Sequence, residues 1–341
     1  GNYKYQSKSK KNLLYVKEQK ELDFLTFYSD CINFSRDLIN SPANKLNPST
    51  YYSKIKNNNL FKSFNFIDYT EKEINSNFPL TCAVGKSSSS KPKVIEITNR
   101  KLSKKDKPLV IIGKGVTFDT GGVNIKPGTS MRNMKKDMGG SAIAISLFLL
   151  ANYFLKKTKI VLIAPIAENA ISSKSMRPGD VYSSVSGKSV EIAHTDAEGR
   201  LLLADAIEKA SSYNPCMIID FATLTGAARV ALGEDLPAYF CNNETFAKKI
   251  ENLNKEKLRC WRLPLYSPYL FKIKSQVADL SNASLDGMAG SITAALFLQE
   301  FLKSPNIPWF HFDTFAWSQD SKGAALQGLD IMSDFLRKNF N

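Results

Sequence analysis

The sequence of 341 residues is poor in the side chains on which most zinc enzymes and disulfide-bonded proteins depend. It has two histidines, His194 and His311, which excludes a histidine-rich zinc site and disfavours a histidine-dependent catalytic triad. Its five cysteines are odd in number and include no CxxC pair, so neither a disulfide framework nor a thiolate zinc site is indicated. This cysteine usage fits a reducing, cytoplasmic compartment. Any metal chemistry in this chain must therefore rest on carboxylates.

The sequence also has no uninterrupted apolar run of membrane-spanning length. Its longest such run, AIAISLFLLANYFL at 142–155, has 14 residues, whereas a spanning helix needs about 20. We therefore expect a buried core helix at this position and no membrane partner.

Negative charge is scarce in the first third of the chain. Residues 1–107 hold 20 Lys and Arg against 10 Asp and Glu, and the remainder holds 26 against 22. A basic segment of this kind can bind nucleic acid or an acidic partner. A lysine-rich surface without a partner explains the same numbers and is the interpretation we favour, because no motif of a nucleic-acid-binding module accompanies the lysines.

Apolar runs rich in β-branched residues alternate with helical patterns from residue 109 onward. The runs at 109–112, 160–166 and 217–221 read as buried strands, and 139–155, 200–212 and 291–303 read as helices. This alternation predicts an α/β fold with a mixed, largely parallel central sheet and helices on both faces. A helix is expected at 21–41, and a polar, lysine-rich linker at 1–20.

Charged residues interrupt this pattern where strands pass into helices. Lys114, Asp119 and Lys126 follow the first run within KGVTFDTGGVNIKPG, and Asp137 precedes the apolar helix. The segment HTDAEGRLLLADA contributes another set, Asp196, Glu198 and Arg200, which alternation would put on one side of an extended segment. Ligands of α/β sheets bind at such strand ends.

Four converging carboxylates would repel one another, and two divalent cations would relieve that repulsion. Oxygen ligands suit magnesium, manganese or zinc. On this interpretation Asp196 and Glu198 face metal ions, and Arg200 holds an anion beside them. The alternative is that these acids are helix caps and surface ion pairs, with Asp196 as a helix N-cap. Composition and spacing alone leave both interpretations open.

The four segments GKGVTFDTGGVNIKP, MKKDMGGSA, HTDAEGRLLLADA and ATLTGAARVALG together resemble the leucyl aminopeptidase family, the M17 metallopeptidases. They occur in the family's order, and the resemblance extends from about residue 30 to the C-terminus. The segment SLDGMAGSITAALFLQ at 284–299 is most similar to a branch of the family found mainly in bacterial genomes.

The resemblance implies a metal-dependent aminopeptidase with two divalent cations, manganese or zinc, with magnesium or cobalt as alternatives. Asp119 and Glu198 would bridge the cations, Lys114 and Asp137 would complete the looser site, and Asp196 would bind at the tighter one. Lys126 would act as an electrophile toward the reacting carbonyl. A bicarbonate ion held by Arg200 would serve as general base.

The resemblance further implies a substrate pocket for peptides with a free N-terminus. Its residues would be Met134, His194, Ala197, Thr223, Leu224, Gly226 and Phe315. His194 stands where many members have asparagine, and Phe315 and Trp317 stand where smaller residues are common. The two aromatic residues would reshape the pocket for the first side chain, so a preference for leucine does not follow.

The family usually has a further N-terminal domain and forms homo-hexamers. We expect residues 1–45 to be a linker segment and helix left from the exit of that domain, and 46–341 to be the catalytic domain. Two other functions are open: a nucleic-acid-binding protein that uses its basic first third, and another two-metal hydrolase such as a phosphatase, for which Lys126 and Arg200 would suit phosphate.

Overall fold

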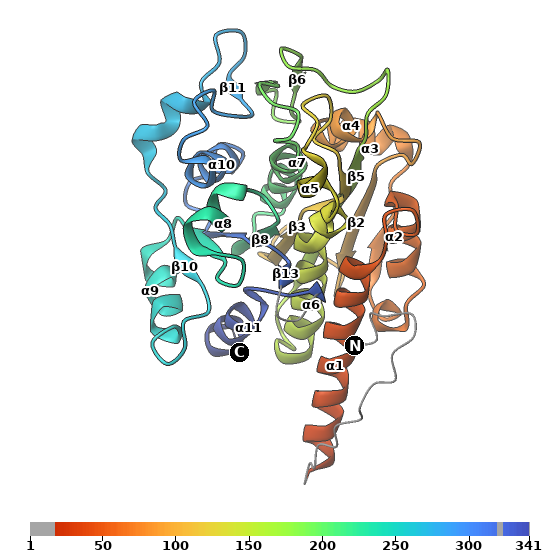
Figure 1. Ribbon diagram of the computed structural model, residues 1–341. Helices are drawn as coiled ribbons and strands as arrows, with labels where there is room; N and C mark the ends of the chain where they lie inside the picture. The colour runs from red at the N-terminus through yellow and green to blue at the C-terminus, as the bar shows by residue number, and fades with distance from the viewer. Residues whose placement is uncertain (1–17, 319–322, 341) are drawn as a thin grey trace.

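A mixed sheet of nine strands forms the centre of the molecule in the computed structural model, which describes residues 18–318 and 323–340 (Figure 1). The strands in spatial order are β1 (Asn65–Ile67), β2 (Lys93–Thr98), β5 (Ile160–Asn169), β3 (Leu109–Gly113), β8 (Met217–Ala222), β12 (Trp309–Asp313), β9 (Ala238–Cys241) and β10 (Trp261–Arg262). Strands β5, β3, β8 and β12 are parallel. Strand β2 is antiparallel to both β1 and β5, and β9 is antiparallel to β12 but parallel to β10. The predicted mixed, largely parallel sheet is confirmed.

Strand β4 (Gly115–Asp119) pairs with the second half of β5, whose first half pairs with β3. Residue 114 therefore lies at the break between β3 and β4, next to the carboxyl end of the parallel strands.

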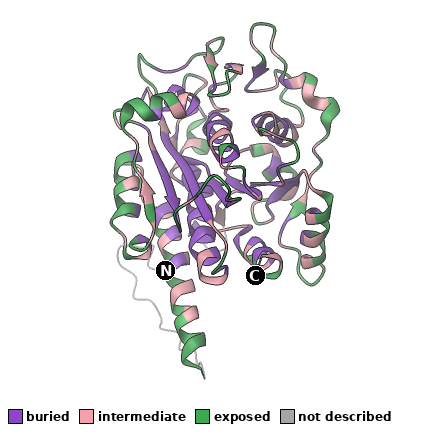
Figure 2. Ribbon diagram, turned by 180° about the vertical axis from the view of Figure 1, so that it is seen from behind, coloured by how far each residue is buried: buried purple, intermediate pink, exposed green. Residues whose placement is uncertain are grey.

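Both faces of the sheet are covered by helices, because successive buried residues of each strand point to opposite faces. In β3, Leu109 and Ile111 join one hydrophobic core, whereas Val110 and Ile112 join the other. Helices on the first face are α1 (Gln19–Asn40), α2 (Pro48–Lys56), η1 (Asn59–Phe61), α6 (Gly139–Phe154), α9 (Glu244–Leu253) and α11 (Leu329–Asn339). Those on the second face are α3 (Glu71–Asn77), α4 (Pro79–Gly85), α7 (Gly199–Ser212), η3 (Ser267–Ile273) and α10 (Gly290–Gln299). Figure 2 shows the buried strands enclosed by helices whose outer faces are exposed.

Helix α6 is the core helix that its apolar sequence predicts. Thirteen of its residues, Gly139 to Ala151, are buried. Together with the preceding 3₁₀ turn η2 (Met134–Met138), it forms the one described helix long and apolar enough to cross a membrane, and 83% of its apolar window is buried inside the fold. Its hydrophobicity is therefore accounted for by packing.

Helix α1 belongs partly to the same core. Cys31, Leu38 and Ile39 are buried against α6, and Ser35 Oγ donates a 2.8 Å hydrogen bond to the carbonyl oxygen of Ala142. The N-terminal turns of α1 extend beyond the rest of the fold (Figure 1). The linker predicted for residues 1–20 lies mostly outside the described residues, since α1 begins at Gln19.

Two short sheets and two short helices complete the described fold. Strands β11 (Leu280–Ser281), β7 (Ser189–Glu191) and β6 (Val181–Ser183) form one sheet, and β13 (Trp317–Ser318) pairs with β14 (Gly323–Ala324). Helices α5 (Gly128–Met131) and α8 (Gly226–Leu232) lie in the loops that follow β4 and β8.

Candidate active site

Polar residues gather at the carboxyl edge of the parallel strands, where α/β proteins bind ligands. Lys114 lies between β3 and β4, Asp119 ends β4, Asn169 ends β5, and Thr223 follows β8. All four are buried. The strand order therefore brings together groups that are up to 109 positions apart in the chain.

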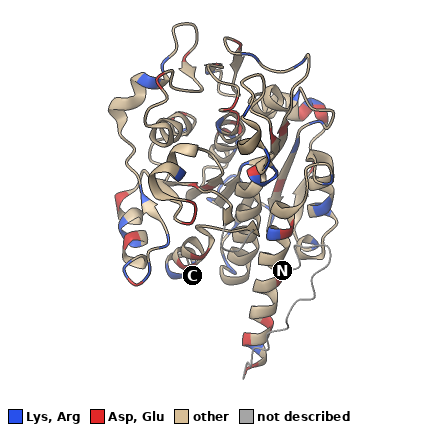
Figure 3. Ribbon diagram, viewed as in Figure 1, with Lys and Arg blue, Asp and Glu red and all other residues tan. Residues whose placement is uncertain are grey.

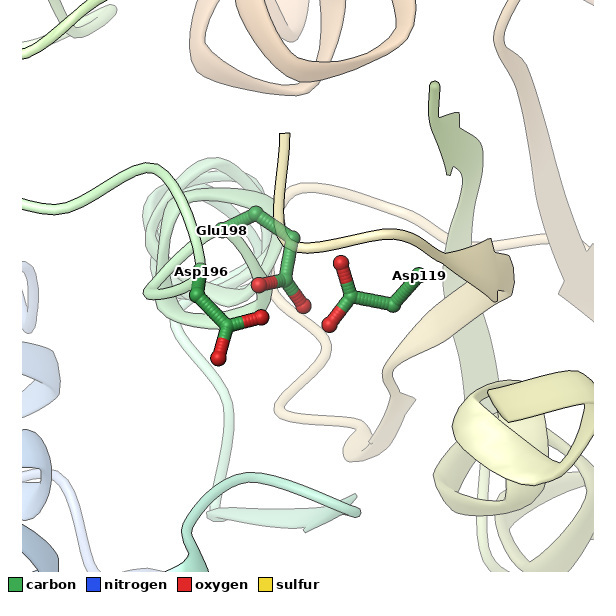
Figure 4. Close-up of side chains that lie close together, drawn as sticks. All are labelled: Asp119, Asp196 and Glu198. Atoms are coloured by element: carbon green, nitrogen blue, oxygen red, sulfur yellow. The ribbon is translucent and has the colours of Figure 1, made fainter. Parts of the chain in front are cut away.

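Three carboxylates converge at this edge (Figure 4). Asp119, Asp196 and Glu198 each place one carboxylate oxygen within 4.8 Å of the other two. Asp119 comes from the end of β4, Asp196 from the loop before α7, and Glu198 from the position just before the helix begins. Oxygen atoms gathered at this spacing are suited to divalent cations.

A fourth carboxylate, that of Asp137 in η2, joins the cluster through Lys114. Lys114 Nζ lies 2.8 Å from Asp137 Oδ1 and 3.0 Å from Glu198 Oε1, and it also donates to the carbonyl oxygen of Thr223 at 2.8 Å. Thr223 Oγ1 donates to Asp137 Oδ1 at 2.8 Å. Asp137 Oδ2 is buried and has no hydrogen-bond partner. An acceptor left in this state is costly unless a cation completes it, so the donor set fits a metal ion.

Lys126 lies on the other side of the carboxylates. Its Nζ is 2.8 Å from Asp119 Oδ2 and also forms a close ion pair with Asp196. Burial alone would lower the pKa values of Lys114 and Lys126, but the surrounding carboxylates outweigh it and hold both above the usual lysine value. Without other cations both lysines are therefore charged.

The pKa values of three of the acids are raised as well, which for a carboxyl group favours the neutral form. Burial, followed by the charge of Asp119, raises the pKa of Glu198 to about 8 and that of Asp196 to about 7. Burial also raises the pKa of Asp137. These shifts measure how unfavourable the clustered negative charge is when only lysines neutralise it.

The alternative of helix caps and surface ion pairs disagrees with this geometry. The N-cap of α7 is Glu198, not Asp196, and its side chain makes no cap hydrogen bond. The Lys114 ion pairs join side chains that are at most 5% exposed. The loop at Thr195 and Asp196 is a turn rather than the extended segment that alternation suggested, yet Asp196, Glu198 and Arg200 still face one cavity.

That cavity has a volume of about 670 Å³. Of the fourteen residues that the sequence assigned to the site, thirteen line it: Lys114, Asp119, Lys126, Met134, Asp137, Asp196, Ala197, Glu198, Arg200, Thr223, Leu224, Gly226 and Phe315. Their separate chain positions thus converge on one hollow of suitable size for a small ligand.

His194 is the exception, because it does not line the cavity. Its side chain is exposed, and its Nδ1 accepts a 3.2 Å hydrogen bond from the backbone N–H of Asp196. Burial and the charges of Lys126 and Arg200 lower its pKa. Trp317 is also absent from the lining and packs instead beside Lys135, whose Nζ lies 5.5 Å from the ring centroid.

Arg200 lies in the first turn of α7 with 7% of its surface exposed. Its Nε and Nη1 are buried and have no hydrogen-bond partner, and its guanidinium lies 5.9 Å from the ring centroid of Phe297. Burial lowers its pKa to about 10, so the group stays charged at neutral pH. Two free donors on a buried cation are suited to a small anion such as bicarbonate.

Several residues that shape the site escaped the sequence interpretation. Asn169 donates from Nδ2 to Asp119 Oδ1 at 2.8 Å and to the carbonyl oxygen of Thr195 at 3.1 Å. Asn124 and Thr195 exchange two 2.9 Å hydrogen bonds between the Asp119 loop and the Asp196 loop. Gly121, at φ +86°, lets the loops approach, since a Cβ there would lie 2.5 Å from the carbonyl oxygen of Asn124.

A second missed group fixes the loop after β8. Asp313, at the end of β12, accepts from the backbone N–H groups of Leu224 and Thr225 at 3.2 and 3.1 Å and from Ser291 Oγ at 3.0 Å. Asn282 holds the loop before Glu198 by donating to the carbonyl oxygens of His194 and Ala197. Polar residues at strand ends were the available signal, but sequence alone does not reveal which loops meet.

Lys136 is the third omission. It is 4% exposed, adjoins Asp137 and lines the cavity. Burial lowers its pKa to about 8. The sequence MKKD gives no indication of which of its two lysines is buried.

Comparison with known proteins gives consistent matches. A model of the cytosol aminopeptidase family, catalytic domain, matches residues 33–332. The probable cytosol aminopeptidase of Syntrophotalea carbinolica is 37% identical over 298 residues, which cover 86% of this chain and 59% of the relative. The cytosol aminopeptidase of Encephalitozoon cuniculi is 41% identical over 288 residues, covering 82% and 58%.

A solved structure agrees with these matches. The crystal structure of cytosol aminopeptidase from Coxiella burnetii is 40% identical in sequence and superposes with a TM-score of 0.87, covering 95% of this chain and 71% of that one. This chain spans less than three fifths of the length of the two curated relatives named above. The family match over residues 33–332 and the identities near 40% show that the chain belongs to the cytosol aminopeptidase family and contains its catalytic domain.

Proposed function

We propose that this protein is a metal-dependent aminopeptidase that removes N-terminal amino acids from peptides. The observation that carries the proposal is the arrangement of Asp119, Asp137, Asp196 and Glu198 with Lys126 and Arg200 around one cavity in a chain of this family. The names of the relatives, cytosol aminopeptidases, support the same reaction and a cytoplasmic location.

Two divalent cations, manganese or zinc, would be held by Lys114 and the four carboxylates. Asp119 and Glu198 would contribute to both cation sites, Lys114 and Asp137 would complete the looser one, and Asp196 would serve the tighter one. When bound, the cations would polarise the scissile carbonyl and make a water molecule acidic enough to attack it. Lys114 can act as a ligand only as a neutral amine, and neighbouring dications would lower its pKa, against the effect of the carboxylates.

The remaining charged groups act on the substrate. The Lys126 ammonium would donate to the oxyanion that develops when the carbonyl is attacked. The unpartnered Nε and Nη1 of Arg200 would hold a bicarbonate ion, which supplies the general base that no histidine in the cavity provides. Arg200 thereby positions the acceptor for the proton of the attacking water.

The first side chain of the substrate would enter between Met134, Thr223, Gly226 and Phe315. Leu224 already donates its N–H to Asp313, so its carbonyl oxygen is the backbone group it offers a peptide. Ala197 would line the path of the chain. We further propose that residues 1–45 are a linker segment and helix ahead of a catalytic domain at 46–341, and that the protein assembles as a homo-hexamer.

The test is purified protein with added manganese or zinc, assayed against aminoacyl fluorogenic substrates and phosphate monoesters in parallel. Hydrolysis of the aminoacyl substrates alone is expected; hydrolysis of the phosphate esters alone would replace the proposal with a phosphatase. In the variant Arg200→Ala we expect a fall in kcat of about 100-fold while bound metal, measured by elemental analysis, stays near normal. An unchanged kcat would remove Arg200 from the mechanism.

The nucleic-acid-binding alternative rests on the basic first third. Five of its 20 basic residues, Lys4, Lys8, Lys10, Lys11 and Lys17, lie outside the described residues, and those from 18 to 107 are interspersed with acids. The alternative requires affinity that falls steeply with salt. Absence of binding to DNA and RNA at low salt would end it.

A further inference from the structure

One end of the active-site cavity carries two cationic side chains around one aromatic ring. Phe315, which follows β12, lines this end, and its ring centroid lies 4.1 Å from Lys136 Nζ and 5.0 Å from Arg229 Cζ. Lys136 comes from η2 and Arg229 from α8, so two separate elements direct positive groups to the same place. Met134, Thr223 and Gly226 line the same cavity.

These two cations differ from the lysines of the carboxylate cluster. Lys114 and Lys126 are each paired with two carboxylates, whereas neither Lys136 nor Arg229 forms an ion pair with any carboxylate in residues 18–318 and 323–340. Lys136 is 4% exposed, and a buried cationic side chain without an acidic partner is costly. Glu234 is the one further carboxylate in the lining. Glu234 also lines a smaller hollow together with Arg229 and Phe315, so this end of the cavity holds two cationic side chains against one carboxylate.

Phe315 also limits the size of what can enter. The next residue, Ala316, is buried and has φ +55°, and a Cβ added to Gly139 would lie 2.2 Å from its Cβ. The backbone that carries Phe315 is thus packed tightly against the start of α6. We expect a long aliphatic side chain to meet the ring and a carboxylate to reach the Lys136 and Arg229 cations beside it.

We propose that this end of the cavity is an anion-accepting pocket, in which Lys136 and Arg229 select peptides whose first residue is glutamate or aspartate. The proposal rests on the aminopeptidase function proposed above. A basic first residue is repelled by the same two groups. An aromatic first residue would have to displace the cations from the Phe315 ring in order to stack on it.

The experiment compares kcat/KM for glutamyl, glutaminyl, leucyl and lysyl fluorogenic substrates. Glutamate and glutamine have nearly the same shape, so their ratio isolates the charge. We expect the glutamyl substrate to be favoured over the glutaminyl one by about tenfold, and this ratio to fall as sodium chloride is raised. A ratio of one or less with good leucyl turnover would overturn the pocket assignment and leave the aminopeptidase function standing. Absence of turnover with all four substrates would instead refute the aminopeptidase function.

Single substitutions test which residues cause the preference for glutamate over glutamine. In Arg229→Gln and Lys136→Met we expect the glutamyl-to-glutaminyl ratio to fall toward one. The matched control is Lys135→Met: Lys135 adjoins Lys136 but donates to the carbonyl oxygen of Asn40 and does not line the cavity, so the ratio should stay unchanged. Because Arg229 is exposed, its variant tests the proposal even if Lys136→Met does not fold.

A binding measurement gives a readout independent of turnover. Calorimetric titration of the manganese-loaded protein with free L-glutamate and L-glutamine should show tighter binding of glutamate, and Arg229→Gln should remove the difference. Equal affinities in the parent protein would contradict the proposal whatever the kinetics show.

Discussion

The position of Lys114 depends on the absence of a side chain at residue 199. A Cβ added to Gly199 would lie 2.3 Å from Lys114 Cε and 2.8 Å from its Nζ. Lys114 is 2% exposed and held by Asp137, Glu198 and the carbonyl oxygen of Thr223, so it has no free space into which to move. A glycine immediately after a candidate metal ligand thus sets the geometry of another ligand on a different loop.

We predict that Gly199→Ala displaces Lys114 from these partners. The expected result is a loss of about 10–100-fold in metal affinity or kcat/KM, with a decrease of about 1–3 kcal/mol in the free energy of unfolding. Elemental analysis, aminoacyl-substrate kinetics and urea denaturation measure the three quantities. Gly128→Ala is the control, because a Cβ there meets nothing within 4 Å. Full metal binding and activity in Gly199→Ala would show that Lys114 does not contribute at its observed position.

At the scale of single residues, the sequence identifies the charged residues of the site better than the polar residues that hold their loops in place. Asp119, Asp137, Asp196 and Glu198 stand out as charged residues at strand ends, although composition and spacing alone did not separate metal ligands from helix caps. Asn169 and Asn282 are not, since asparagine is common in any loop and its partner depends on which loops the sheet brings together. His194 shows the limit of neighbouring position: it lies two residues from Asp196, yet it is exposed and does not line the cavity, so its role in substrate binding stays a prediction.

At the scale of elements, the strands at 109–113, 160–169 and 217–222 were predictable because uninterrupted β-branched runs suit a sheet buried on both faces. The helix predicted over 291–303 ends at Gln299. Its apolar pattern continues through Phe301, which is 3% exposed, because that ring packs against Phe297 from a turn beyond the helix. The apolar periodicity indicates which residues are buried, and here buried residues continue beyond the end of the helix.

Strands β8 and β12 are also joined by a buried polar pair. His311 Nδ1 lies 2.5 Å from Asp220 Oδ1, and Trp309 Nε1 donates to Asp220 Oδ2 at 2.6 Å. Burial opposes charge on His311, and its Nε2 has no hydrogen-bond partner, but Asp220 and then Asp313 outweigh this and raise the pKa of His311 above its usual 6.5, with Arg200 opposing them. The protonated ring therefore stabilises the folded state.

The pH dependence follows from the direction of that shift. A raised pKa in the folded state means that the stabilisation is complete below about pH 6.5 and is lost as the pH rises through the folded value. We predict that His311→Gln lowers the free energy of unfolding by about 1–3 kcal/mol at pH 6, and by less at pH 9. Urea denaturation of both proteins in chelator measures the difference at each pH. A difference that is constant or grows with pH would mean that His311 is neutral in the fold.

At the scale of the whole molecule, the net charge of +14 is a poor guide to the site. Basic and acidic residues are interspersed along the ribbon in Figure 3, whereas Asp119, Asp137, Asp196 and Glu198 all line one cavity. The net charge depends only on composition, whereas the fold decides which charged residues meet: five carboxylates and five cationic side chains line this one cavity. Family resemblance supplied the identities of the candidate ligands, and the unfavourable effect of bringing these acids together is visible in the raised pKa values of Asp196 and Glu198.

The unfavourable clustering of these carboxylates predicts that metal binding raises the thermal stability of the whole fold. Cations that bind the folded cluster and not the unfolded chain stabilise the protein by mass action, by about 2.7 kcal/mol at a free concentration 100 times Kd. For a chain of this size we expect manganese or zinc to raise Tm by roughly 4 °C relative to chelator. Glu198→Gln should abolish the rise. Glu208→Gln should keep it, because Glu208 lies on the same helix α7 but bonds to Ser184 outside the cavity. Differential scanning calorimetry measures each Tm, and an equal rise in both variants would place the stabilising cations elsewhere on the molecule.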